Sequence, residues 1–130
     1  MQKEFIDNNP ILKQTIEFSL MIIEYCEQLN TEKKFIISKQ LIRSATSIGA
    51  NAMEAQNAES KADFIHKIKI AAKEADETQY WLILCEFAKG YSPCNHLTLK
   101  LQEIQKILNS ILGTAKRKTP FSYFFSFFIF

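Results

Sequence analysis

An aspartate and a histidine three residues apart come nearest, in this sequence, to the spacing of a metal site. Asp63 and His66 resemble half of a carboxylate-x-x-His motif. Further carboxylates stand at Glu54, Glu74 and Glu77. A di-iron site in a helical bundle takes two such pairs on separate helices and one glutamate from each of the two others. The only other histidine, His96, begins a different segment, so we expect no metal and no cofactor.

Nucleophilic catalysis has no better support in the sequence. Cys26, Cys85 and Cys94 form no C-x-x-C pair and are odd in number, which is typical of reduced thiols that fill a core in the cytosol. A catalytic cysteine or serine needs a positioned base and an oxyanion hole, and no motif supplies them. A glycine-rich phosphate-binding loop is also missing from the sequence. We therefore expect a protein that is not an enzyme.

A row of polar residues runs along one side of a helix expected at 37–58. Its members are Gln40, Ser44, Ser47, Asn51 and Glu54. A solvated helix face more usually carries lysine and glutamate, so we expect these groups to be half-buried and hydrogen-bonded to a neighbouring helix or subunit. Glu74 and Glu77 on the following helix complete the set. We call these seven residues the polar seam, and we expect it to fix how helices or subunits register.

Basic residues lie on the outer sides of the same two helices, at Lys39, Arg43, Lys67, Lys69 and Lys73. Interleaved carboxylates dilute their field, and the formal charge of the chain is only +2. An ordinary solvated face is one interpretation. The other is binding of RNA or DNA phosphates. Such binding would rest on backbone and shape, because no aromatic residue is interleaved with these lysines for base stacking.

Four amphipathic helices would position these residues, and we predict them at 10–29, 37–58, 61–89 and 95–115. Asn9 followed by Pro10 is typical of a helix start, and Ser60 with Asp63 is a variant of the capping box. Short connections between four amphipathic helices favour an all-α, up-down four-helix bundle. The length of 130 residues suits one domain with a real core.

Apolar residues at helical spacing predict which side of each helix faces the core. In the second helix they are Ile37, Leu41, Ala45, Ile48, Ala52 and Ala55. In the third they are Phe64, Ile68, Ala71, Ala75, Thr78, Leu82 and Cys85, and in the fourth Leu97, Leu101, Ile104, Leu108, Ile111 and Ala115. Gly49 costs roughly 1 kcal/mol inside a helix, which predicts close approach by another backbone there.

The two ends of the chain differ from this pattern. Residues 1–8 read as a short polar lead without a signal pattern, which favours the cytoplasm. We assign residues 1–115 to the bundle and 116–130 to a basic and aromatic C-terminal tail. Its apolar run is about 10 residues, half of the ~20 that a membrane-spanning helix needs. We expect this tail to pack on the bundle or on another subunit rather than on a membrane.

The middle third of the chain resembles a bacterial family of small four-helix bundles first found encoded in intervening sequences of 23S ribosomal RNA genes. The accessory variability determinant of diversity-generating retroelements belongs to it. The residues that carry the resemblance are Gln40, Leu41, Arg43, Ser47, Ile48, Asn51, Glu54, Ala55, Asp63, Phe64, Ala71, Glu74, Ala75, Glu77, Thr78, Tyr80, Trp81 and Leu82. The resemblance implies a cyclic homopentamer and, for the retroelement protein, binding of nucleic acid and of a reverse transcriptase. The aromatic tail has no counterpart in the family.

Two functions of different classes remain open on this reading. In the first, the protein is a non-catalytic oligomeric adaptor that meets structured RNA or a reverse transcriptase complex through its lysines. In the second, it is a self-assembling scaffold for protein–protein interaction with no nucleic-acid role. Both place the protein in the cytoplasm and require no cofactor.

Overall fold

The computed structural model describes residues 2–116, and all regular structure in that range is helical. The helices are α1 (Gln2–Asp7), α2 (Pro10–Thr31), α3 (Phe35–Ala55), α4 (Lys61–Phe87) and α5 (Asn95–Ala115). The tail from 117 to 130 lies outside the described residues, and so does the prediction that it packs on the bundle or on another subunit.

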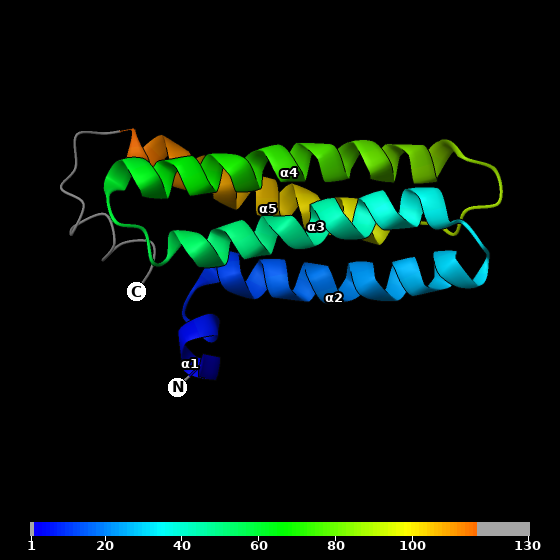
Figure 1. The fold of residues 1–130 in the computed structure, drawn as a ribbon, viewed down its shortest axis with the longest axis horizontal. Helices are drawn as coiled ribbons and strands as arrows, with labels where there is room; N and C mark the ends of the chain where they lie inside the picture. The colour runs from blue at the N-terminus through cyan, green and yellow to red at the C-terminus, as the bar shows by residue number, and fades with distance from the viewer. Residues whose placement is uncertain (1, 117–130) are drawn as a thin grey trace.

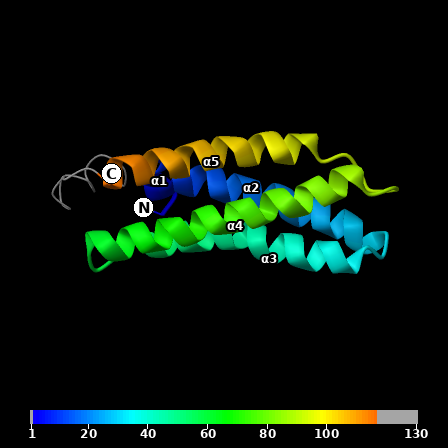
Figure 2. The same cartoon turned by 90° about the horizontal axis from the view of Figure 1, so that it is seen from above.

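The four long helices lie side by side along the length of the molecule, and α1 turns away from them at the start of α2 (Figure 1). Neighbours in sequence are neighbours in space, and α5 closes the bundle by packing against α2. A view from above shows the helices in two layers, with α4 over α3 (Figure 2). The chain therefore forms the predicted all-α bundle of four long helices, with one short helix added.

Several helix ends differ from the predicted bounds. Residues 2–7, expected as a polar lead, form α1, whose Phe5 packs against the core. Lys33 has a φ of +62° and makes the turn after α2, so that α3 begins at Phe35 rather than at residue 37. Helix α4 ends at Phe87 with Ala88 as its C-cap rather than at residue 89, and Gly90 lies in the following loop. Its φ of +81° is one that glycine adopts without strain.

Two predicted helix starts are confirmed by their side-chain contacts. The Asn9 side chain accepts a hydrogen bond from the Leu12 N–H at 3.3 Å, and its amide donates to Gln56 Oε1 at 2.9 Å, which ties α2 to the end of α3. Ser60 Oγ accepts from the Asp63 N–H at 3.0 Å. The Asp63 carboxylate accepts from the N–H of Glu59, so the reciprocal half of the capping box is shifted by one residue.

The core lies where the apolar spacing placed it. Every predicted core residue of α4 and α5 is buried, and so is every one of α3 except Ile37, which is partly buried. Helix α2 adds Phe18, Ile22 and Leu29, which are fully buried. Such burial supplies most of the free energy that holds an amphipathic bundle together.

Gly49 lies at a close contact between α2 and α3. A β-carbon placed on Gly49 would lie 3.1 Å from both Cβ and Oγ1 of Thr15, and 3.8 Å from the Thr15 carbonyl carbon. The close approach was predicted, but the first atoms met belong to a side chain and the backbone comes second. The Thr15 hydroxyl donates back to the Ile11 carbonyl oxygen at 2.7 Å, so that it needs no partner on α3.

Candidate functional site

A buried pair of hydroxyl groups joins α3 to α4 at the centre of the polar seam. Oγ1 of Thr78 and Oγ of Ser44 lie 2.9 Å apart, and both residues are fully buried. Thr78 Oγ1 also lies 2.7 Å from the Glu74 carbonyl oxygen, and Ser44 Oγ lies 3.4 Å from that of Leu41. Each hydroxyl therefore has a polar partner on its own helix and one on the other, which fixes the register of α3 against α4.

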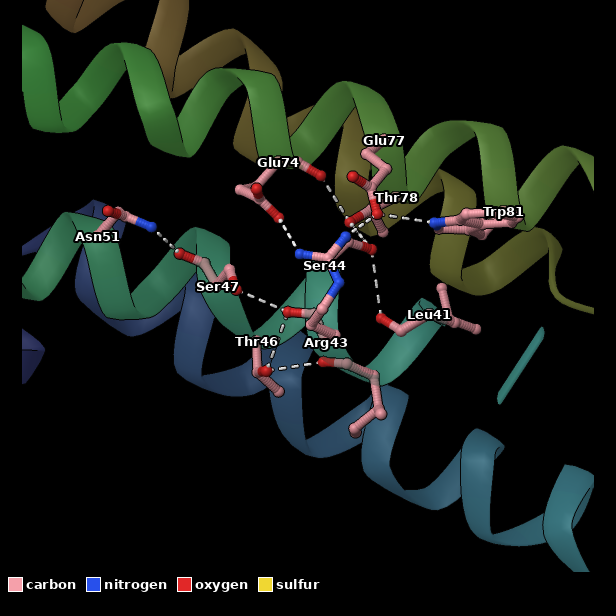
Figure 3. Close-up of polar contacts among 11 residues, drawn as sticks. Leu41, Arg43, Ser44, Thr46, Ser47, Asn51, Glu74, Glu77, Thr78 and Trp81 are labelled. Carbon is pink, nitrogen blue, oxygen red and sulfur yellow. Dashed lines mark hydrogen bonds and ion pairs between the residues drawn. The ribbon is translucent and has the colours of Figure 1, made fainter. Parts of the chain in front are cut away.

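Arg43 extends this contact to the surface (Figure 3). Its guanidinium donates to Glu74 Oε2 at 3.3 Å and also contacts Glu77 Oε2. The Trp81 indole N–H donates to the same Glu77 oxygen at 2.9 Å. The arginine that the sequence placed among the nucleic-acid contacts is thus held by two carboxylates of the polar seam.

These contacts set the protonation of Glu77. The hydrogen bond from Trp81 lowers the pKa of the Glu77 carboxyl, and the Arg43 guanidinium lowers it further. The pKa of Arg43 is raised in turn, chiefly by its hydrogen bond to Glu77. A carboxyl with a lowered pKa in the folded state adds stability above the pKa of an unfolded glutamate. That stability is lost as the pH falls through the lowered value.

A fluorescence titration of Trp81 should report this carboxyl directly, because Trp81 is the only tryptophan of the chain. We expect its emission to change with a midpoint below the ordinary range of a glutamate, since protonated Glu77 no longer accepts as a carboxylate. Arg43→Gln should raise the midpoint, and Glu77→Gln should abolish the transition. Glu54→Gln serves as the matched control, because Glu54 lies on the same helix as Arg43 without contacting the indole. A wild-type midpoint at or above the ordinary glutamate range would contradict the assignment.

Of the remaining seam residues on α3, two bond to their own helix, one pairs with a lysine of α4, and one has no partner in the described chain. Ser47 Oγ donates to the Arg43 carbonyl oxygen at 2.7 Å, and the Asn51 amide donates to that of Ser47 at 2.8 Å. Glu54 is exposed, with Lys67 Nζ 4.0 Å away. Gln40 is half-buried, and within residues 2–116 its amide has no hydrogen-bond partner.

Apolar side chains adjoin the polar seam on the same outer side of the bundle. Ile36 lies one helical turn before Gln40 and is 85% exposed. Trp81 and Leu84 continue the row of Glu74 and Glu77 along α4 and are half-buried. We call this surface the seam face. Its members are Ile36, Gln40, Arg43, Ser47 and Asn51 on α3, and Glu74, Glu77, Trp81 and Leu84 on α4.

Three of the five predicted nucleic-acid contacts have free ammonium groups. Lys39, Lys69 and Lys73 are exposed, and none of them forms an ion pair within the described part of the chain. Lys69 and Lys73 lie one turn apart on the outer side of α4, while Lys39 lies near the start of α3. Arg43 and Lys67 have carboxylate neighbours instead. The five residues do not form one continuous patch.

Two residues that hydrogen-bond to the polar seam, Thr78 and Trp81, were not connected with it from the sequence. Thr78 was predicted as a core residue without its hydrogen bond to Ser44, and Trp81 was named only for the family resemblance, without its bond to Glu77. A threonine within an otherwise apolar stripe was the one available signal for the first, because a buried hydroxyl needs a partner.

The three cysteines lie in the core of the bundle. Cys26, Cys85 and Cys94 are free and buried, as predicted. Burial raises the pKa of all three thiols, that of Cys85 to about 11, so they stay protonated and weakly nucleophilic at neutral pH. Across residues 2–116, no three side chains of histidine, cysteine, aspartate or glutamate are grouped to hold a metal ion. None of the helices described combines the length and apolar content that crossing a bilayer requires.

Comparison with known proteins agrees with the helical fold described above. The model of the family described as 23S rRNA-intervening sequence protein matches residues 7–110, which include most of all four long helices. The chain is also similar to the crystal structure, at 1.70 Å resolution, of a protein of unknown function from the S23 ribosomal protein family of Bacteroides thetaiotaomicron. The two are 42% identical with a TM-score of 0.75, and the match covers 78% of this chain and 97% of that chain. No curated protein matches the chain.

Proposed function

The chain belongs to the 23S rRNA-intervening sequence protein family, and we propose that it is a non-catalytic adaptor which assembles with copies of itself through the seam face. The observation that carries the proposal is an exposed apolar side chain next to a half-buried amide that bonds to no group of the described chain. Ile36 is 85% exposed, and one turn away the half-buried Gln40 amide lacks a partner within residues 2–116. Another copy of the chain lying on this face would cover Ile36 and hydrogen-bond the Gln40 amide.

A cyclic homopentamer is the form of assembly that we propose. The number five comes from the proteins that this chain resembles, and the chemistry of the seam face supports a contact between unlike surfaces. The ion pairs of Arg43 at the centre of this face can set the register between two copies. Ile36, Trp81 and Leu84 beside them supply apolar surface to bury. Unlike surfaces that meet head to tail close into a ring when the rotation between copies allows it.

The partner that we propose for this ring is structured RNA, alone or in a complex such as that of a reverse transcriptase, in the bacterial cytoplasm. Support comes from Lys39, Lys69 and Lys73, whose ammonium groups are free of carboxylates in the described structure. A ring repeats every lysine once per copy, so that a weak site on one chain becomes several phosphate contacts on the assembly.

The second candidate is a self-assembling scaffold for protein partners with no nucleic-acid role. Its support is the ion pairing of Arg43 and the position of Lys67 beside Glu54. The neighbouring carboxylates partly neutralise the charges of Arg43 and Lys67. The net charge of +2 adds little long-range attraction for phosphates.

Binding to a structured ribosomal RNA fragment over a range of salt separates the two candidates. We expect affinity to fall linearly in log salt, and the slope to shrink by roughly 0.7–0.9 for each phosphate contact that is lost. Lys69→Gln with Lys73→Gln should flatten the slope and leave the oligomer mass unchanged. Lys106→Gln, which replaces an exposed lysine of α5, is the control for a generic loss of charge. An oligomer that binds no RNA at low salt would favour the scaffold instead.

A further inference from the structure

One side of the bundle, along the outer junction of α2 and α3, carries no charged residue over about three helical turns. Its members are Ile16, Ser19, Leu20 and Ile23 on α2, and Ile42, Thr46, Ala50 and Met53 on α3. Leu20 is 61% exposed, and Ile23 and Met53 are also exposed. We call these eight residues the uncharged face.

Contacts between α2 and α3 show where this face lies. Thr15 meets Gly49, and Cys26 Sγ lies 3.6 Å from the Ser38 carbonyl oxygen, so these residues mark the line of contact between the helices. Ile16 and Ala50 each follow one of those contacts by one residue and are turned outward from it.

The charged residues within the same two spans point to other neighbours. Glu17 accepts from Lys100 of α5 at 2.8 Å, and Arg43 is held by α4. This stretch of the α2–α3 side is therefore free of charged residues, and Glu27 and Lys39 lie beyond its end. The α3–α4 side has Arg43 and Glu74, and exposed lysines lie on the outer sides of α4 and α5.

The same chain contains a segment whose composition matches this face. Of the ten residues from Phe121 to Phe130, eight are aromatic or aliphatic and two are serine. The segment lies beyond residues 7–110, where the family model matches, so the shared fold leaves it without an assigned place. An apolar run of this kind exposed to water is prone to pair with other chains. A surface on its own bundle that covers the run would prevent such association.

The length of the segment suffices for the contact. Helix α5 ends at Ala115, at the end of the bundle where α2 begins and α3 ends (Figure 1). The uncharged face spans twelve residues of α3, or about 18 Å at 1.5 Å per residue. An extended chain of the fifteen residues after Ala115 reaches up to about 50 Å, which is enough to pass the end of α2 and lie along the face.

We propose that the aromatic tail, residues 119–130, docks on the uncharged face of its own chain. The tail buries its aromatic side chains against Leu20, Ile23 and Met53, while Lys116, Arg117 and Lys118 stay in water. The contact is independent of the seam face and of whether copies assemble. It assigns the α2–α3 side to the tail and leaves the α3–α4 side to other copies.

Photo-cross-linking of the full chain tests this docking. Phe125 is replaced by p-benzoylphenylalanine, and the irradiated protein is digested with trypsin. Cleavage after lysine and arginine yields peptides 14–33 and 44–61, which carry seven of the eight residues of the face. We expect the tail peptide to be joined mainly to these two. Cross-links mainly to α4 or α5 peptides, or no cross-link to the bundle, would overturn the proposal.

Two variants and a labelling control sharpen the result. Leu20→Glu should lower the yield into both peptides about tenfold, because a charge replaces the apolar contact. Leu99→Glu on α5, where the wild-type residue is 54% exposed, should leave it unchanged. In a co-expressed mixture of isotopically heavy and light chains, cross-links should join peptides of the same mass label. Joining of heavy to light would assign the tail to a neighbouring copy and overturn docking within one chain.

Discussion

Ile36→Glu is expected to convert the proposed pentamer into monomers at micromolar concentration while the bundle stays folded. Ile36 is 85% exposed in one chain, so a carboxylate there meets water and changes the stability of the isolated bundle little. In the proposed ring the side chain is covered by the next copy, where an unpaired carboxylate is strongly unfavourable. Every interface of a ring carries the same substitution, so all of them weaken together. Light scattering should then report a mass about one fifth of the wild-type value.

The control for that substitution is Leu99→Glu, which adds the same charge at a 54% exposed leucine on α5. Its mass should equal that of the wild type, and the circular dichroism of both variants should show the helix content of the wild type. If Ile36→Glu kept the full oligomer mass, the subunit contact would lie elsewhere than on the seam face.

Gly49→Val is expected to lower the free energy of unfolding by about 1–3 kcal/mol or somewhat more. A β-carbon at this position already lies 3.1 Å from two atoms of the Thr15 side chain, and valine adds two methyl groups to it. Helices α2 and α3 must then move apart, which loosens the packing of Phe18 and Ile48. Urea unfolding followed by circular dichroism measures the change.

Gly113→Ala is the matched control, because Gly113 has no neighbouring atom within 4 Å of an added β-carbon. Alanine there should leave stability unchanged or raise it by up to about 1 kcal/mol through helix propensity. Equal destabilisation in the two variants would mean that glycine in these helices is not selected by the contact with Thr15.

The fold follows from the sequence where a local cause decides it. Asn9 and Ser60 are capping residues, and their capping hydrogen bonds come from residues three positions further along the chain. The four-three spacing of Leu97 to Ala115 likewise needs no tertiary information to face the core. Helix α1 escaped prediction because its contact with the core through Phe5 is a tertiary one, added to a segment that reads as polar.

The candidate site was less predictable, because its contacts between α3 and α4 join residues more than thirty positions apart. Arg43 pairs with Glu74 and Glu77, and this pairing depends on the register of α3 against α4. From spacing alone Arg43 sits on an outer face with Lys39 and looks available for phosphate. Only the register set by Ser44 and Thr78 brings the two glutamates to it.

The mass of the purified full chain in solution tests self-assembly through the seam face most directly. Multi-angle light scattering at micromolar concentration and physiological salt should report five times the chain mass of 15.1 kDa, with a single species that Ile36→Glu dissociates. A wild-type mass of one chain, unchanged when the concentration is raised tenfold, would contradict the proposed adaptor ring.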